Sequence, residues 1–185
     1  MKPELVGPIL AANVASLGRY PLSKGTDRFR AAAAAWLAQR YALPRAPDPA
    51  SEVLVLNGTR EGLFLAALAA SRNAATKIGR PAILVPNPCY GAYSAGAAAS
   101  HCETIYLATT KATGFMPDLD TIPQDILART VAFYIASPAN PQGSVASTEY
   151  LRKLIGLARR HSFVVFSDEC YSEIYFKNRP TGMLE

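Results

Sequence analysis

Five short runs of apolar and β-branched residues recur along the chain, and segments of helical composition separate most of them. The runs lie at residues 53–56, 82–86, 104–107, 131–136 and 163–166. Strands with so few polar positions are typical of a parallel sheet, which is covered on both faces. We therefore predict an α/β fold: a mostly parallel sheet with helices on both faces and right-handed crossovers.

Helix signals occupy several of the intervening segments. Residues 59–71 are rich in Leu and Ala, and residues 147–160 carry an apolar stripe at helical spacing. Thr26 can cap a further helix over residues 28–41, and the proline-rich residues 44–52 favour a rigid loop after it. We predict a helical lead-in over residues 1–50 and a sheet domain over residues 51–185.

Composition excludes several classes of protein. With 185 residues and 50% hydrophobic composition, the chain can bury one good core. No apolar run approaches the roughly 20 residues that cross a bilayer, and the first residues do not form a signal peptide, so we expect a soluble cytoplasmic protein with no membrane partner. The formal charge of +5 is spread along the chain and does not predict nucleic-acid binding.

The cysteines and histidines do not predict a metal site. Cys89, Cys102 and Cys170 form no CxxC pair, and only His101 and His161 could join them. An odd number of cysteines fits no complete disulfide framework, so we expect reduced thiols.

Ligands of a parallel sheet gather beyond the carboxyl ends of its strands, so the residues after each run are the candidates for a site. After residue 56, Gly58 and Thr59 open a helix whose free backbone N–H groups suit a phosphate, although the same turn also suits a capped helix. After residue 86, Tyr90 and Tyr93 stand near the same edge, where a tyrosine ring can stack on a flat ligand or fill the core.

Two further strand ends carry polar side chains. Asn140 lies between Pro138 and Pro141, and an amide held in such a loop can bind a ligand oxygen with little ordering cost. Asp168 follows the last apolar run almost directly, so its carboxylate is partly desolvated and requires a cation or hydrogen-bond donors.

Two types of cation could match this carboxylate. Magnesium would indicate a P-loop ATPase, but the only similar glycine-containing segment, residues 91–97, lacks the lysine and the hydroxyl of GxxxxGK[ST]. The other cation is a protonated heterocyclic nitrogen. A phosphate site, a stacking ring, a fixed amide and a buried carboxylate together match pyridoxal 5'-phosphate, whose ring accepts electrons when its nitrogen stays protonated. GxGxxG is absent, so a nicotinamide dinucleotide fold is unsupported.

Five motifs, YPLSKG, NGTREG, NPCYGAY, SPANPQG and SDECYSEIYF, carry a resemblance from about Tyr20 to the end of the chain. In order and approximate spacing they resemble the aminotransferase class I and II family of fold type I pyridoxal phosphate enzymes. They are most similar to the branch with succinyldiaminopimelate and LL-diaminopimelate aminotransferases. The resemblance implies that residues 51–185 are part of a cofactor-binding large domain whose C-terminal portion is absent.

The resemblance also implies a role for each matching residue. Gly58, Thr59 and Arg60 would form the phosphate turn, and Tyr90 would stack on the pyridine ring. Asn140 and Tyr171 would bond the phenolic oxygen, and Asp168 would pair with the ring nitrogen. Tyr20 would reach the phosphate of a neighbouring subunit, which implies a homodimer. Gln142 replaces the usual threonine of the SPxNPTG motif, a change that we expect the loop to tolerate.

Two residues of the family pattern have no match in the chain. The Schiff-base lysine lies roughly 30 residues beyond the aspartate in the family, and the arginine that grips the substrate carboxylate lies further on. We therefore expect a fragment of an enzyme that transfers amino groups between amino acids and 2-oxo acids, inactive alone. Two alternatives remain open: another pyridoxal phosphate reaction such as a C–S lyase or a regulator domain, and a non-catalytic remnant that binds a cofactor or partner.

Overall fold

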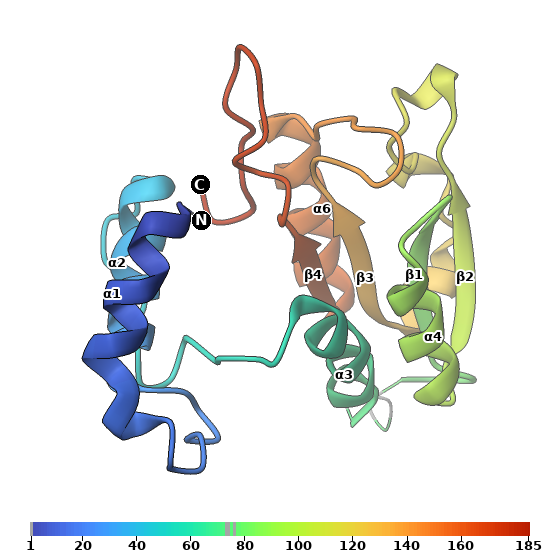
Figure 1. Ribbon diagram of the computed structural model, residues 1–185. Coiled ribbons are helices and arrows are strands. Elements are labelled where there is room, and N and C mark those ends of the chain that lie inside the picture. The colour runs from blue at the N-terminus through green and yellow to red at the C-terminus, as the bar shows by residue number, and fades with distance from the viewer. Residues whose placement is uncertain (1, 73–74, 76) are drawn as a thin grey trace. The chain divides into compact units, whose positions relative to one another are not determined.

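Residues 2–72, 75 and 77–185 are described in the computed structural model (Figure 1). They belong to two compact units. The first comprises Met1–Gln39 and Pro44–Leu56, and the second comprises Arg40–Leu43 and Asn57–Glu185.

Two helices and a 3-10 turn dominate the first unit. They are α1 (Pro3–Asn13), η1 (Val14–Ser16) and most of α2 (Asp27–Arg40). The hydroxyl of Thr26 accepts a hydrogen bond of 3.2 Å from the backbone N–H of Phe29, which confirms the predicted N-cap. Gly25 has a φ of +74°, and a side chain there would run into Val55, so both its conformation and its neighbour require glycine.

One predicted strand is wrong. Residues 53–56 pair with no strand in the described part of the chain, and Leu54 and Leu56 are exposed. A four-residue run of β-branched and apolar residues favours an extended backbone, but a strand also needs a neighbour whose N–H and C=O groups complete its ladder. Among the described residues, 53–56 have no such neighbour.

The second unit contains a four-stranded sheet in which every pairing is parallel, as predicted (Figure 1). The strand order is β2-β1-β3-β4. The strands are β1 (Ala82–Asn87), β2 (Glu103–Ala108), β3 (Thr130–Ala136) and β4 (Val164–Asp168). All seven residues of β3 are buried, because this central strand is covered on both faces.

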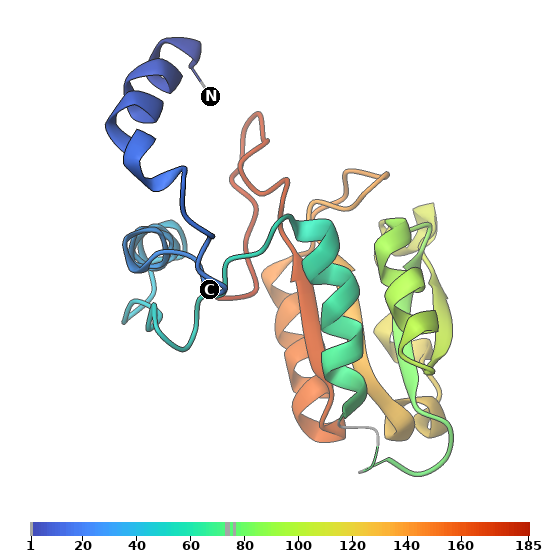
Figure 2. The same cartoon turned by 60° about the horizontal axis from the view of Figure 1, so that its bottom comes forward.

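Helices cover the two faces of this sheet, and each face has its own apolar cluster (Figure 2). α3 (Thr59–Ser71) and α4 (Gly91–Ala99) lie on one face, against Ile83, Val85 and Tyr134. α6 (Thr148–His161) lies on the other, against Leu84, Phe133 and Ile135. The alternation along β1 and β3 follows from the two-residue period of a strand. The remaining short helices are η3 (Lys111–Thr113), η4 (Leu119–Thr121) and α5 (Gln124–Arg129).

Arg40 and Tyr41, which belong to the second unit, hold the segment after β4. The guanidinium of Arg40, whose side chain is 3% exposed, forms an ion pair with Glu173 and donates to the carbonyl oxygens of Ser172 and Pro180. Tyr41 donates its hydroxyl to Glu169, and Ser167 and the backbone N–H of Met183 donate to the other oxygen of the same carboxylate. These bonds fix the backbone that directly follows Asp168.

Candidate functional site

A cavity of about 170 Å³ opens where the carboxyl ends of β3 and β4 meet the beginning of α3. Its lining residues come from four separate segments of the chain, and they include five of the eight predicted site residues. The lining is formed by Thr59, Leu63, Tyr90, Ala136, Asn140, Asp168, Cys170 and Tyr171. The cavity therefore lies beyond the carboxyl ends of parallel strands, where ligands of such sheets are expected.

Asp168 ends β4 with a half-buried carboxylate. Its position is set by the sheet, because Asp168 pairs with Ala136 and its carbonyl oxygen accepts a bond of 3.1 Å from the N–H of Ser137. Two neutral donors reach the carboxylate: the hydroxyl of Tyr93 at 2.6 Å and the N–H of Cys170 at 3.3 Å. Among the described residues, no lysine, arginine or histidine forms an ion pair with it. The carboxylate is thus oriented, but its charge is not matched.

Tyr93 is a hydrogen-bond partner of Asp168 that the sequence did not identify. Its ring is 1% exposed and stacks on Tyr134, so the core interpretation of this tyrosine is right for the ring. Its hydroxyl, however, donates to Asp168, 75 positions further along the chain. Burial, and then the adjacent Asp168 carboxylate, raise the pKa of Tyr93 far above its ordinary value, so the phenol stays protonated and remains a donor.

The beginning of α3 leaves backbone donors open beside the cavity. Gly58 is the N-cap residue, and no side chain caps this end of the helix. The backbone of Gly58 is extended, a conformation open to any residue, and nothing described lies within 4 Å of the place where a Cβ would stand. Thr59 adds a hydroxyl at the first helical position. The helix dipole and the free N–H groups of this turn suit an anion.

Arg60 lies outside the cavity and interacts with Tyr90. Its Nε donates a hydrogen bond of 2.6 Å to the hydroxyl of Tyr90. The guanidinium also lies 5.8 Å from the centre of the tyrosine ring. Arg60 thus holds the ring of Tyr90 beside the beginning of α3.

Asn140 and Tyr171 line the cavity from two loops. The Asn140 loop is closed by two backbone bonds, from Gly143 to the carbonyl of Ala139 at 2.7 Å and from Ala139 to the carbonyl of Ser144 at 2.8 Å. Gln142, the replacement noted in the sequence, donates its amide to Thr109 at 2.8 Å and so ties this loop to the residue after β2. The ring of Tyr171 is 40% exposed, which leaves it accessible to a ligand.

Tyr20 belongs to the first unit and is 98% exposed. Its role toward a neighbouring subunit stays a prediction.

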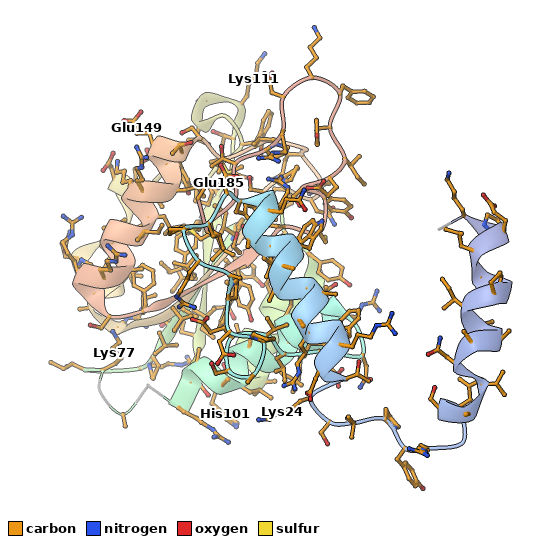
Figure 3. All side chains as sticks on the ribbon, turned by 90° about the vertical axis from the view of Figure 1, so that its left-hand side faces the viewer. Lys24, Lys77, His101, Lys111, Glu149 and Glu185 are labelled. Atoms are coloured by element: carbon orange, nitrogen blue, oxygen red, sulfur yellow. The ribbon has the colours of Figure 1, made fainter. Side chains whose placement is uncertain are left out.

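No lysine is among the described residues that line the cavity. Lys77 and Lys111 lie at opposite ends of the second unit (Figure 3). The ammonium of Lys77 donates to the carbonyl of His161, at the end of α6. The cavity therefore has no internal nucleophilic amine in the described part of the chain.

The described ranges contain no cluster of three or more His, Cys, Asp or Glu side chains able to hold a metal ion. They also contain no helix with the length and apolar character needed to span a bilayer.

Known proteins match the chain over nearly its whole length. Residues 9–183 match the family model of aminotransferase class I and II. An LL-diaminopimelate aminotransferase of Syntrophobacter fumaroxidans is 34% identical over 176 residues, which are 95% of this chain and 43% of that protein. The crystal structure of an aminotransferase from Neisseria meningitidis Z2491 is 34% identical, with a TM-score of 0.88 over 98% of this chain and 45% of its own.

A second crystal structure, of the aminotransferase AspB from Helicobacter pylori 26695, is 28% identical and has a TM-score of 0.87. It covers 100% of this chain with 46% of its own. The chain thus spans less than half the length of each protein named here. The resemblance drawn from the five motifs is confirmed, and so is the α/β fold with its parallel sheet.

Proposed function

The chain belongs to the aminotransferase class I and II family, and on that premise we propose that it supplies the cofactor-binding part of a pyridoxal 5'-phosphate-dependent aminotransferase. The observation that carries this proposal is the single cavity lined by Thr59, Tyr90, Asn140, Asp168 and Tyr171. These side chains offer a hydroxyl, an aromatic ring, an amide, an unmatched carboxylate and a phenol. This donor set fits an aromatic ligand with a phosphate, a phenolic oxygen and a cationic ring nitrogen.

Each group of the cofactor has a partner in this assignment. The N–H groups at the start of α3, with Gly58 and the hydroxyl of Thr59, bind the phosphate. Tyr90, held by Arg60, stacks on the ring. Asn140 and Tyr171 hydrogen-bond the phenolic oxygen.

The remaining partner, Asp168, keeps a proton on the ring nitrogen, because the half-buried carboxylate has no cation of its own among the described residues. When bound and protonated at this nitrogen, the cofactor supplies an electron sink for the amino acid. The protein's part is to bind, to orient and to hold that proton in place.

The Schiff-base lysine and the carboxylate-gripping arginine of the family pattern would lie in another segment of the whole protein. No lysine lines the cavity in the described part of the chain, and the matched relatives are more than twice as long. We infer that a segment outside these residues provides the lysine to which family enzymes attach the cofactor and the arginine that grips the substrate carboxylate. Tyr20, as a ligand of a neighbouring subunit's phosphate, would make the assembly a homodimer. A cytoplasmic location completes the proposal.

Titration with the cofactor tests whether this site binds pyridoxal 5'-phosphate. Pyridoxal 5'-phosphate added to the protein that carries these residues should produce saturable absorbance and circular-dichroism changes above 300 nm, and Asp168→Ala should abolish them. Asp120→Ala is the matched control, because Asp120 is an exposed carboxylate that pairs with Lys153. Unchanged binding by Asp168→Ala would contradict the site.

Assays of enzymatic activity test whether the reaction is amino transfer. The relatives' name makes LL-diaminopimelate the first amino donor to try, with 2-oxoglutarate as acceptor, in the protein that carries these residues. Formation of glutamate supports amino transfer. Release of pyruvate and ammonia from a sulfur-containing amino acid, without transfer, would instead indicate a lyase.

A further inference from the structure

Two buried tyrosines connect α3 to Asp168. Tyr93 of α4 donates its hydroxyl to Oδ2 of Asp168 at 2.6 Å. Its ring stacks on Tyr134 of β3, with ring centres 4.7 Å apart and planes 9° apart. Tyr134 in turn donates its hydroxyl to the carbonyl oxygen of Leu63, one turn after Thr59. We call Tyr93 and Tyr134 the tyrosine pair.

The tyrosine pair stands behind the cavity rather than in it. Leu63 and Asp168 line the cavity, whereas neither tyrosine does, and both rings are at most 1% exposed. Close packing on all sides leaves such rings one arrangement. Two stacked rings and two hydrogen bonds therefore connect Leu63, one turn into α3, with the Asp168 carboxylate.

The chemical type of the donor at Asp168 matters. A lysine or arginine in the place of Tyr93 would match the charge of the carboxylate and compete with a cationic ligand. A phenol orients the carboxylate and leaves its charge available. The raised pKa of Tyr93 keeps this donor neutral and protonated. Oδ1 accepts the longer bond, of 3.3 Å, from the N–H of Cys170, and a carboxylate oxygen can accept more than one donor.

We propose that Tyr93 is a positioning residue for the cofactor's ring nitrogen: it holds the Asp168 carboxylate in place, while Tyr134 ties it to the helix that binds the phosphate. The proposal rests on the proposed function, because the ring nitrogen is that of pyridoxal 5'-phosphate. Tyr93 acts through Asp168 and does not touch the ligand.

Two ligands separate this role from a merely structural one. The first is pyridoxal 5'-phosphate, and the second is its analogue with C–H in place of the ring nitrogen. In the apo form of the protein that carries these residues, Tyr93→Phe keeps the stack but removes the bond to Asp168. We expect it to weaken binding of the cofactor about tenfold, the effect of one hydrogen bond to a charged group, and to change binding of the analogue less than about twofold.

Tyr150→Phe is the matched control. Tyr150 lies on α6 and donates its hydroxyl to the carbonyl of Pro117 at 2.9 Å, so this variant also loses one largely buried tyrosine hydrogen bond. It should change the affinity for neither ligand. Tyr134→Phe, which releases Leu63 but keeps the stack, should weaken both ligands by a similar factor of about three.

A double-mutant cycle tests whether Tyr93 acts through Asp168. In an Asp168→Asn background, Tyr93→Phe should have no further effect on cofactor affinity, because its action passes through the carboxylate. Equal cofactor affinity of Tyr93→Phe and the unsubstituted protein, or equal loss for both ligands, would overturn the inference alone. Failure of the unsubstituted protein to bind the cofactor, or full binding by Asp168→Ala, would overturn the proposed function instead.

Discussion

Arg60 and Tyr90, 30 positions apart in the chain, are joined by a hydrogen bond of 2.6 Å from the guanidinium Nε to the tyrosine hydroxyl. The bond links the first turn of α3 to the residue that precedes α4. It restrains a half-buried ring that lines the cavity, and the first prediction follows from this restraint.

Truncating the ring of Tyr90 should cost more than removing its hydroxyl. If Tyr90 stacks on the cofactor as proposed, Tyr90→Ala removes a contact worth about 0.5–1.5 kcal/mol and should weaken binding of pyridoxal 5'-phosphate roughly 2- to 12-fold. Tyr90→Phe keeps the ring and loses only its bond to Arg60, so the affinity should fall less than about threefold. Absorbance titration of both variants measures the difference. Equal losses in the two variants would mean that the ring does not stack on the cofactor.

Cys170 should be a slow nucleophile whose reactivity reports on Asp168. Burial, and then the hydrogen bond to Asp168 and its charge, raise the pKa of the Cys170 thiol from 9.0 to about 11. The thiolate fraction at pH 8 is then about 100-fold lower than for a thiol of unshifted pKa, and alkylation by iodoacetamide should be slower in proportion. The rate should rise with pH until about pH 11.

Asp168→Asn removes the charge and should speed alkylation of Cys170 at pH 8, but by less than about 100-fold, because the contribution of burial remains. Peptide mapping by mass spectrometry follows Cys170 separately from Cys89 and Cys102. Asp120→Asn, on an exposed carboxylate paired with Lys153, is the control and should leave the rate as it is. An unchanged rate in Asp168→Asn would show that the carboxylate does not act on this thiol.

Gly96 should resist replacement by alanine. A Cβ at this position of α4 would lie 2.9 Å from the carbonyl oxygen of Phe64 and 3.1 Å from the Cβ of Ala67, both on α3. The two helices would have to separate, so Gly96→Ala should lower the free energy of unfolding by about 1–3 kcal/mol. Urea denaturation measures it. Gly156→Ala, on α6 with open space at the Cβ, is the matched control and should be neutral or slightly stabilising.

Arg40 should matter more for stability than its ion-pair partner Glu173. Arg40→Gln leaves the buried carbonyl oxygens of Ser172 and Pro180 short of a donor and breaks the pair with Glu173, and should cost about 2–4 kcal/mol. Glu173 is 52% exposed, so Glu173→Gln should cost less than about 1 kcal/mol. Urea denaturation of the two variants compares them. Similar costs would mean that the ion pair, not the carbonyl bonds, secures the segment after β4.

Much of the fold was predictable because its signals are local. The four apolar runs that became β1 to β4, the helices at 59–71 and 147–160, and the cap at Thr26 depend on residues within a few positions of one another. The strand predicted at residues 53–56 is wrong because a strand also depends on a partner from elsewhere in the chain. The composition of this run favours an extended backbone, but it does not show whether another strand lies beside it.

The candidate site was also predictable in part. The order of the motifs, and the rule that parallel strands present their carboxyl ends at one edge, were enough to bring Thr59, Tyr90, Asn140, Asp168 and Tyr171 to a common edge in prediction, and these residues line one cavity. Their roles toward a cofactor stay predictions.

The sequence by itself determined approximately where four strands lie and which polar residues stand at or just after their carboxyl ends, because the period of a strand or helix appears in neighbouring side chains. Only the tertiary structure decided which neighbour each of those residues meets. The Tyr93 hydroxyl on Asp168, the Arg60 guanidinium on Tyr90 and the hold of Arg40 on the last segment each join distant positions. Such pairs form because close packing allows each side chain a single position. The local sequence pattern does not show which distant residue lies beside that position.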